Sequence, residues 1–117
     1  MVIEIEKQDE ICILRLKGRF ITGADKEYLG SKTEEVKSGR HKKVLVDFRE
    51  VPYIDSTGIG FLVGLYTSVT RSLGGRFVLV GASPRVGEVL TLTRLNTVIP
   101  MARDMPAGLA ALDAGSA

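Results

Sequence analysis

The amino-acid sequence predicts an α/β fold in which one domain combines a mixed sheet of about four or five strands with about four helices. Three observations support this prediction. The chain has 117 residues, a length that fits one domain and leaves little room for a second. Short apolar runs alternate with longer helical patterns in the order strand, strand, helix, strand, helix, strand, helix. Strands separated by helices pair in parallel through right-handed crossovers, whereas the first two strands can pair antiparallel.

The first half of the chain has the patterns of three strands and one helix. Residues 2–6 alternate apolar and polar side chains, as a half-buried strand does, and residues 11–17 form a second run rich in apolar and β-branched residues. Residues 24–37 have helical periodicity with a thin apolar stripe, which predicts a largely exposed helix that ends at Ser38-Gly39. Three consecutive aliphatic residues within residues 43–48 indicate a central strand covered on both faces.

The second half continues with two helices and a strand between them. Residues 56–73 form a long helical stretch, and residues 76–80 (Arg-Phe-Val-Leu-Val) have the composition of another buried strand. Ser83 and Pro84 suit the N-cap and the first turn of a helix that runs to about Leu95.

We assign residues 2–103 to one domain and residues 104–117 to a weakly ordered C-terminal tail. Residues 98–101 are predicted to form a short edge strand, because Pro100 cannot donate a hydrogen bond inside a sheet. The tail is rich in alanine and glycine, and we expect one weak helical turn near Leu109 before it frays.

Charge and composition exclude several classes of function. The formal net charge is +2, from 16 basic and 14 acidic residues, which is too small an imbalance to indicate nucleic-acid binding. The basic cluster Arg40-His-Lys-Lys43 lies between a helix and a strand and is expected to be a solvated loop. The chain lacks both an apolar span of about 18 residues and a basic N-terminal region followed by an apolar one. We therefore expect a cytoplasmic protein without direct contact to nucleic acid or membrane.

Residues able to hold a metal or to form disulfides are scarce. Cys12 is the one cysteine, which excludes an internal disulfide and a multi-cysteine zinc site, and its apolar neighbours predict a small buried side chain. His41 is the one histidine, and we expect it to be a solvated side chain in the basic loop rather than a catalytic base. We therefore expect no metal site and no cofactor.

A helix that starts at Ser56 has two distinct faces when about 100° of rotation is given to each residue. The apolar arc, which must face the sheet, contains Ile59, Phe61, Leu62, Val63, Leu65, Tyr66, Val69 and Leu73. The opposite arc contains Ser56, Thr57, Gly60, Gly64, Thr67, Ser68 and Arg71. Each glycine costs about 1 kcal/mol relative to alanine inside a helix, and Gly60 and Gly64 together make a smooth surface. Either they pack against a loop of the same chain, or they let a partner approach closely.

Ser56 lies at the start of this smooth arc and has two interpretations. It can be the N-cap of the helix, shared with Asp55, because both side chains accept hydrogen bonds from free backbone N–H groups. A helix N-terminus also stabilises a phosphate, through its macrodipole and the same N–H groups. A phosphate adds about −1.5 to −2 charges, and an unpaired charge in an interface costs on the order of 3–5 kcal/mol. Such a change is large enough to switch binding off.

Catalytic motifs fit these residues poorly. Gly58-Ile-Gly60 with Gly64 resembles a dinucleotide-binding pattern, but it lies about ten residues after the preceding strand, and no acidic residue follows the next strand at Val80-Gly81. A nucleophile elbow needs glycine two residues before the serine, where Ile54 stands. An aspartic-protease loop reads Asp-Ser-Gly or Asp-Thr-Gly, whereas Asp-Ser-Thr-Gly here has one residue more. A catalytic serine would also need a nearby base. The sequence therefore does not support an enzyme.

The segment from Val44 to Gly60, Val-Leu-Val-Asp-Phe-Arg-Glu-Val-Pro-Tyr-Ile-Asp-Ser-Thr-Gly-Ile-Gly, resembles the signature of STAS domains, specifically of bacterial anti-sigma factor antagonists. The resemblance covers about residues 2–103 and implies a compact α/β fold with a mixed sheet. Three later segments continue the pattern in register: Gly74-Gly-Arg-Phe-Val-Leu-Val80, Ser83-Pro-Arg-Val86 and Leu92-Thr-Arg-Leu-Asn-Thr-Val-Ile99.

The resemblance implies that Ser56, the serine of Asp-Ser-Thr-Gly, is the phosphoacceptor. In such proteins the dephosphorylated form binds an anti-sigma factor, which is often also the ATP-dependent serine kinase, and so frees a sigma factor for transcription. A PP2C-type phosphatase would reverse the mark. Thr57 is a further candidate acceptor, although inside the first turn we expect it to be structural. The expected partner-binding residues are Asp55, Ser56, Thr57, Gly58, Gly60, Gly64 and Thr67.

One segment departs from the family pattern. Many antagonists carry Gly-x-Leu-Asp after the second strand, whereas this chain reads Gly18-Arg-Phe-Ile-Thr-Gly23, with Ile21 in the aspartate position. The departure keeps an alternative function open. In that alternative the chain is a STAS scaffold or a transporter-associated subunit of another partner-switching system, and Ser56 is not phosphorylated.

Overall fold

A five-stranded sheet organises the molecule, and the computed structural model describes it together with its helices over residues 2–19 and 26–114. The strands lie side by side in the order β1-β2-β3-β4-β5. β1 and β2 pair antiparallel and the later pairs are parallel, which confirms the predicted mixed sheet. The strands are β1 (Val2–Gln8), β2 (Ile11–Lys17), β3 (Lys43–Glu50), β4 (Arg76–Val80) and β5 (Met101–Ala102).

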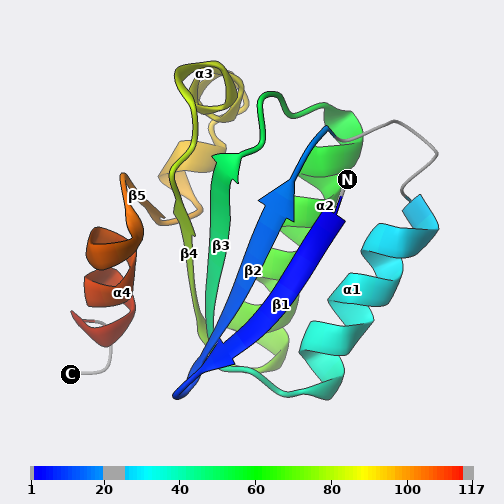
Figure 1. Cartoon of the computed structure of the whole chain (residues 1–117), viewed down its shortest axis with the longest axis vertical. Coiled ribbons are helices and arrows are strands. Elements are labelled where there is room, and N and C mark those ends of the chain that lie inside the picture. Colours follow the sequence, from blue (N-terminus) through cyan, green and yellow to red (C-terminus); the bar gives the residue numbers. More distant parts are fainter. Residues whose placement is uncertain (1, 20–25, 115–117) are drawn as a thin grey trace.

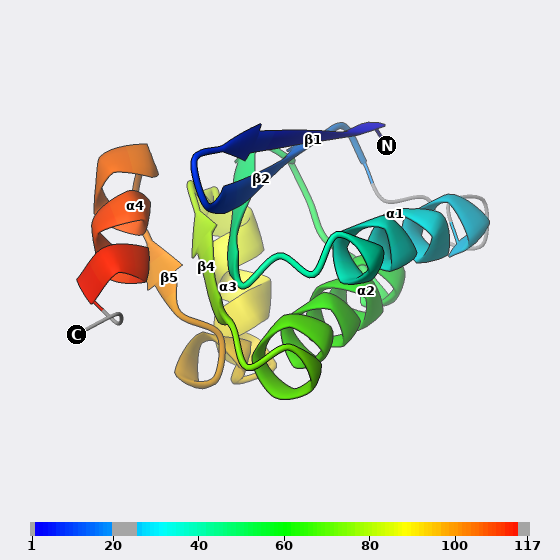
Figure 2. The same ribbon diagram turned by 90° about the horizontal axis from the view of Figure 1, so that it is seen from below.

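Helices cover the two faces of the sheet unequally (Figure 1). Figure 2 shows α1, α2 and α3 on one side of the sheet and α4 on the other side, next to β4 and β5. The part of the second face formed by β1 and β2 carries charged side chains, and ion pairs join Lys17 to Glu4 and Arg15 to Glu6. The helices are α1 (Lys26–Ser38), α2 (Ser56–Thr67), α3 (Pro84–Leu92) and α4 (Met105–Ala114).

Alternate residues of β3 enter two separate cores. Val44, Val46 and Phe48 belong to the larger core, which also holds side chains of α1, α2 and α3. Leu45 points the other way, into a smaller core that includes Leu112 of α4. Because successive side chains of a strand point to opposite faces, this alternation places β3 between two covered layers. The prediction of a central strand covered on both faces is confirmed.

The helix predicted over residues 56–73 widens in its last turn. The α-helix ends at Thr67, and a π-helical turn, Ser68–Ser72, completes the segment. Gly74 then adopts a φ of +65°, and a Cβ on Gly75 would overlap the backbone of Lys42. Gly74 suits glycine because of its left-handed φ, and Gly75 suits glycine because a side chain would have no room beside Lys42.

The segment from α3 to β5 differs from the prediction at both ends. α3 ends at Leu92 rather than near Leu95, and a short 3-10 turn takes up the residues that follow. The edge strand is shorter and later than predicted, since β5 covers only Met101–Ala102. The carbonyl of Pro100 accepts a hydrogen bond from the N–H of Leu79 at 2.9 Å. Proline can fill this position because the contact requires an acceptor and no donor.

The chain after residue 104 forms a helix, so the prediction of one weak turn near Leu109 is wrong. Asp104 begins α4, because its carboxylate accepts a hydrogen bond from the N–H of Ala107 at 2.9 Å. Leu112 is 1% exposed and fills the smaller core. A Cβ on Gly108 would overlap the side chain of Val80. The glycine that favoured fraying in the sequence therefore lets α4 approach the sheet closely.

Candidate functional site

Ser56 is the first residue of α2, and Asp55 is its N-cap. The Asp55 carboxylate accepts a hydrogen bond from the N–H of Gly58 at 3.0 Å, and its carbonyl accepts one from the N–H of Ile59 at 2.9 Å. Asp55 alone thus caps the helix, whereas the sequence predicted a cap that Ser56 could share with Asp55. The Ser56 side chain is exposed, and its hydroxyl has no hydrogen-bond partner among the residues that the structure describes.

The loop between β3 and α2 is held by two buried side chains. Val51 and Ile54 are 1% and 0% exposed and belong to the larger core. The N–H of Val51 also donates to the carbonyl of Phe48 at 3.0 Å. Tyr53, between the two anchors, is 42% exposed. The loop is therefore fixed against the core while it presents Tyr53 and then Ser56 to solvent.

The exposed side of α2 carries Ser56, Gly60, Val63, Gly64 and Thr67, which we call the α2 stripe. A Cβ on Gly60 or Gly64 would meet nothing within 4 Å in the described part of the chain, so no described loop packs against these glycines. Val63 is 38% exposed, although the sequence analysis placed it in the sheet-facing arc. It lies almost two full turns after Ser56, and this rotation returns it to the same face.

The other predicted partner-binding residues lie below this surface. Gly58 is buried, whereas Asp55 and Thr57 are half-buried. Asp55 and Gly58 share the capping hydrogen bond, so they hold the first turn of α2 in place. The structure thus gathers the predicted Ser56, Gly60, Gly64 and Thr67 on one exposed surface and adds Val63 to them.

Helix α3 contacts the loop before Ser56 through a side chain that the sequence analysis missed. Ser83 caps α3 as predicted, by accepting a hydrogen bond from the N–H of Val86 at 3.2 Å. This start of the helix places the guanidinium carbon of Arg85 over the Tyr53 ring, 5.1 Å from its centroid. Both side chains are exposed. Tyr53 and Arg85 are far apart in sequence, and local periodicity does not predict contacts between such residues.

An ion pair between the buried Asp47 and the exposed Arg49 lies at the end of β3 that leads into this loop. The Asp47 side chain is 6% exposed, and Arg49 donates to its carboxylate from Nη2 at 2.7 Å and from the backbone N–H at 3.0 Å. Burial by itself raises the pKa of Asp47, but the hydrogen bonds and the charge of Arg49 outweigh burial and hold that pKa below its ordinary value. Asp47 is therefore ionised at neutral pH.

The histidine and the cysteine of the chain lie away from Ser56. His41 precedes β3 and Ser56 follows it, so the two residues lie at opposite ends of that strand. Cys12 is fully buried as predicted, and burial raises its pKa to about 11, which keeps the thiol protonated at neutral pH. Within residues 2–19 and 26–114, no group of three His, Cys, Asp or Glu side chains could hold a metal ion. Over the same residues, no helix has the length and apolarity to cross a membrane.

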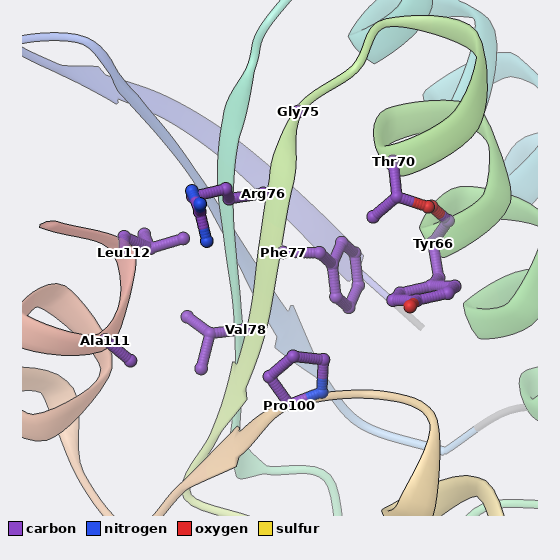
Figure 3. Close-up of a pocket in the computed structure, with 9 residues that line it drawn as sticks. All are labelled: Tyr66, Thr70, Gly75, Arg76, Phe77, Val78, Pro100, Ala111 and Leu112. Carbon is purple, nitrogen blue, oxygen red and sulfur yellow. The ribbon is translucent and has the colours of Figure 1, made fainter. Parts of the chain in front are cut away.

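Two hollows on the described surface lie away from Ser56. One, of about 170 Å³, lies at the opposite end of α2, where Phe77 of β4 points toward Tyr66 and Thr70 (Figure 3). The rings of Tyr66 and Phe77 meet edge to face with centroids 5.6 Å apart. The lining of this hollow contains neither a carboxylate nor a histidine. Another hollow, of about 390 Å³, includes the basic cluster of residues 40–43.

Gly18 and Arg19 begin the segment that departs from the family pattern, and they are the part of it among the described residues. Gly18 adopts a φ of +97° at the end of β2, and its N–H donates to the carbonyl of Glu50 at 3.0 Å. This conformation favours glycine and turns the chain away from the sheet. Ile21, which stands in the position of the usual aspartate, lies outside the described residues.

Comparison with known proteins gives a family and its relatives. Residues 2–107 match the family model of the STAS domain. The anti-sigma-B factor antagonist of Listeria monocytogenes is 32% identical over 84 residues, which are 68% of this chain and 73% of that protein. Alignments with relatives from Thermotoga neapolitana and Thermotoga maritima span only about half of each protein, 50% of this chain and 51% of the relative.

Solved structures share the fold at lower sequence identity. An anti-sigma factor antagonist from Mycobacterium paratuberculosis matches with a TM-score of 0.84 and 19% identity, over 96% of this chain and 93% of the other. The Bacillus cell fate determinant SpoIIAA in its phosphorylated form matches with a TM-score of 0.66 and 21% identity, over 88% and 93% of the two chains. The structures show the fold, and the sequence matches show the family. The chain therefore belongs to the STAS domain family, and its relatives include bacterial anti-sigma factor antagonists.

Proposed function

We propose that this protein is an anti-sigma factor antagonist controlled at Ser56. Its unphosphorylated form binds an anti-sigma factor, which is also the serine kinase, and thereby releases a sigma factor. Phosphorylation of Ser56 ends the binding, and a PP2C-type phosphatase restores it. The observation that carries this proposal is the position of Ser56, which is exposed at the start of α2, outside the capping hydrogen bond and at the end of the α2 stripe.

The start of α2 suits a phosphate that changes the surface and leaves the fold intact. The first backbone N–H groups of a helix have no partner within the helix, and the macrodipole favours negative charge there. Asp55 performs the capping, so a modified Ser56 removes no hydrogen bond from the described fold. The phosphate adds about two negative charges beside the carboxylate of Asp55. An acidic or apolar partner surface on the α2 stripe would then face a strongly anionic edge.

The α2 stripe suits a closely packed partner. Gly60 and Gly64 leave the helix backbone accessible, and Val63 between them supplies exposed apolar area. A partner helix that crosses here can pack against backbone, because neither glycine carries a side chain in the way. The relative from Listeria monocytogenes bears the name of an anti-sigma factor antagonist, and the related SpoIIAA has been solved in a phosphorylated form. Both findings support the proposed role.

Phosphorylation by a kinase tests the proposal. The wild type, Ser56→Ala and Thr57→Ala are incubated with ATP and, one at a time, with the serine-kinase anti-sigma factors of the source organism. We expect the mass of one phosphoryl group to be added to the wild type and to Thr57→Ala, and none to Ser56→Ala. A chain that binds partners without acquiring this mass with any kinase would instead be a STAS scaffold or transporter-associated subunit. Equal addition to Ser56→Ala would place the acceptor elsewhere.

A further inference from the structure

Arg85 and Tyr53 form an exposed pair beside the loop that leads to Ser56. The guanidinium of Arg85, in the first turn of α3, lies over the face of the Tyr53 ring, 5.1 Å from its centroid. Tyr53 is 42% exposed, whereas its neighbours Val51 and Ile54 are buried. Tyr53 is therefore held on a fixed loop and Arg85 on the first turn of α3, and both side chains are exposed to solvent.

The position of Arg85 is not explained by the stability of α3. A cation in the first turn of a helix lies near the positive end of the macrodipole, which disfavours it. Glu88 lies three residues later on the same helix and would be the ordinary ion-pair partner. The structure places no carboxylate within ion-pairing distance of Arg85 among the residues it describes, and the guanidinium lies over Tyr53 instead. Arg85 thus presents an uncompensated positive charge whose position the ring fixes.

We propose that Tyr53 and Arg85 extend the docking surface from the α2 stripe onto α3 and receive an acidic side chain of the anti-sigma factor. This inference rests on the proposed function. Charge complementarity selects the occupant, because a guanidinium without a partner binds a carboxylate through two parallel hydrogen bonds. The exposed ring supplies apolar contact for the aliphatic part of that acidic side chain. Tyrosine and arginine are also the residues most enriched among those that dominate binding energy at protein interfaces.

The contact that Tyr53 and Arg85 make with the partner also depends on whether Ser56 is phosphorylated. Tyr53 and Ser56 are separated by three peptide units, which span at most roughly 11 Å. The bound applies to the Cα atoms alone and already exceeds the Debye length of about 8 Å at physiological ionic strength. A phosphate on Ser56 therefore acts on a carboxylate that approaches Arg85 as a screened repulsion, which is strongest at low salt. Phosphorylation thus weakens the contact at Tyr53 and Arg85 as well as the contact at the α2 stripe.

Charge reversal at Arg85 tests the inference with the anti-sigma factor that binds the wild type. We expect Arg85→Glu to weaken binding at least about 10-fold and to flatten its dependence on salt. Arg85→Lys keeps the charge but loses the planar stacking, so a smaller loss of about 3-fold is expected. Tyr53→Ala should weaken binding about as much as Arg85→Glu, and Tyr53→Phe, which keeps the ring, should bind like the wild type. Arg76→Glu, the matched reversal at the opposite end of the sheet, should stay within about 2-fold.

The possible outcomes separate this inference from the proposed function. Equal affinities for Arg85→Glu and Arg76→Glu, with the wild type still bound and still sensitive to phosphorylation, would overturn the inference alone. Failure of every anti-sigma factor of the source organism to bind the wild type would remove the proposed function and this inference with it. Both side chains are exposed, so the variants should unfold at the wild-type denaturant concentration. Arg85→Lys, with its expected loss of about 3-fold, decides the question if a larger replacement disturbs the loop.

Discussion

The carboxylate of Asp55 accepts a hydrogen bond from the backbone N–H of Gly58 at 3.0 Å, and this bond caps helix α2. Because Asp55 satisfies the free N–H group, the neighbouring Ser56 side chain carries no capping role and stays exposed. The start of α2 thus divides two tasks between adjacent residues. Asp55 holds the helix, and Ser56 is available for modification.

Replacement of these two residues should have unequal effects on stability. We expect Asp55→Ala to lower the free energy of unfolding by about 1 kcal/mol, the usual cost of losing an N-cap. Ser56→Ala should change it by less than about 0.5 kcal/mol, as exposed substitutions usually do. Urea unfolding of the two variants measures the difference directly. A loss for Ser56→Ala as large as that for Asp55→Ala would mean that Ser56 shares the cap.

Alanine in the α2 stripe should strengthen the fold and weaken binding. Gly60→Ala and Gly64→Ala add a Cβ that meets no described atom, so each should raise the free energy of unfolding by about 0.5–1 kcal/mol. The same methyl groups should obstruct a closely packed partner and reduce its affinity about 10-fold. Gly30→Ala, in an equally open position of α1, is the matched control and should stabilise without affecting binding. Unchanged binding by both stripe variants would show that the partner docks elsewhere.

The ion pair of Asp47 and Arg49 should make the free energy of unfolding depend on pH in the acidic range. The pKa of Asp47 is lower in the folded chain than its ordinary value of 3.8, so its ionised form stabilises the fold at neutral pH. This contribution is lost as pH falls below 3.8 and through the folded pKa, because the unfolded chain takes up the proton first. The difference in unfolding free energy between wild type and Asp47→Asn should therefore shrink on acidification. A difference that is constant with pH would contradict the pair's role.

Arg49 can be tested separately from the titration. Arg49→Met removes the donors to a carboxylate that remains buried, and we expect a loss of about 1–2 kcal/mol at neutral pH. The expected loss is smaller than for a fully buried pair, because the Arg49 side chain is half exposed and solvent screens its charge. Without Arg49 the burial of Asp47 raises its pKa, so the stability deficit of the variant relative to the wild type should shrink as acid protonates that carboxylate.

The contact between α4 and the sheet gives a further test. Gly108→Ala places a methyl group against Val80, which is fully buried and cannot move aside cheaply. We expect a loss of about 1–3 kcal/mol, the usual cost of overpacking a core. Ala110→Gly changes an exposed position of the same helix and should cost no more than about 1 kcal/mol. Thermal unfolding of the two variants distinguishes lost packing from lost helix propensity.

Much of the fold follows from patterns local in sequence. The alternation in β1, the aliphatic run of β3 and the serine-proline start of α3 each identify their element, because periodicity and capping act over a few residues. The end of α2 did not follow, since the helical periodicity runs on to residue 73 without marking the π-helical turn at Ser68–Ser72. α4 was missed because its packing depends on the tertiary fold. Its alanine and glycine residues have little apolar signal until the sheet supplies a surface for Leu112.

The candidate site could be predicted only in part. The motif around Ser56 and the glycines of α2 are local, and the structure places them together on one surface. Asp55 and Ser56 are both good capping residues, so their sequence left the choice between them open. The contact between Tyr53 and Arg85 joins two segments through the tertiary fold and leaves no trace in local periodicity.

If phosphorylation of Ser56 switches partner binding, the two forms of the chain must differ in their affinity for one anti-sigma factor. The unphosphorylated chain and the chain phosphorylated at Ser56 are titrated against the same purified anti-sigma factor, with Ser56→Ala as the form that cannot be modified. We predict that the phosphorylated chain binds about 100-fold more weakly, and that Ser56→Ala binds like the unphosphorylated wild type. Equal affinities of the phosphorylated and unphosphorylated chains would show that Ser56 is not the switch.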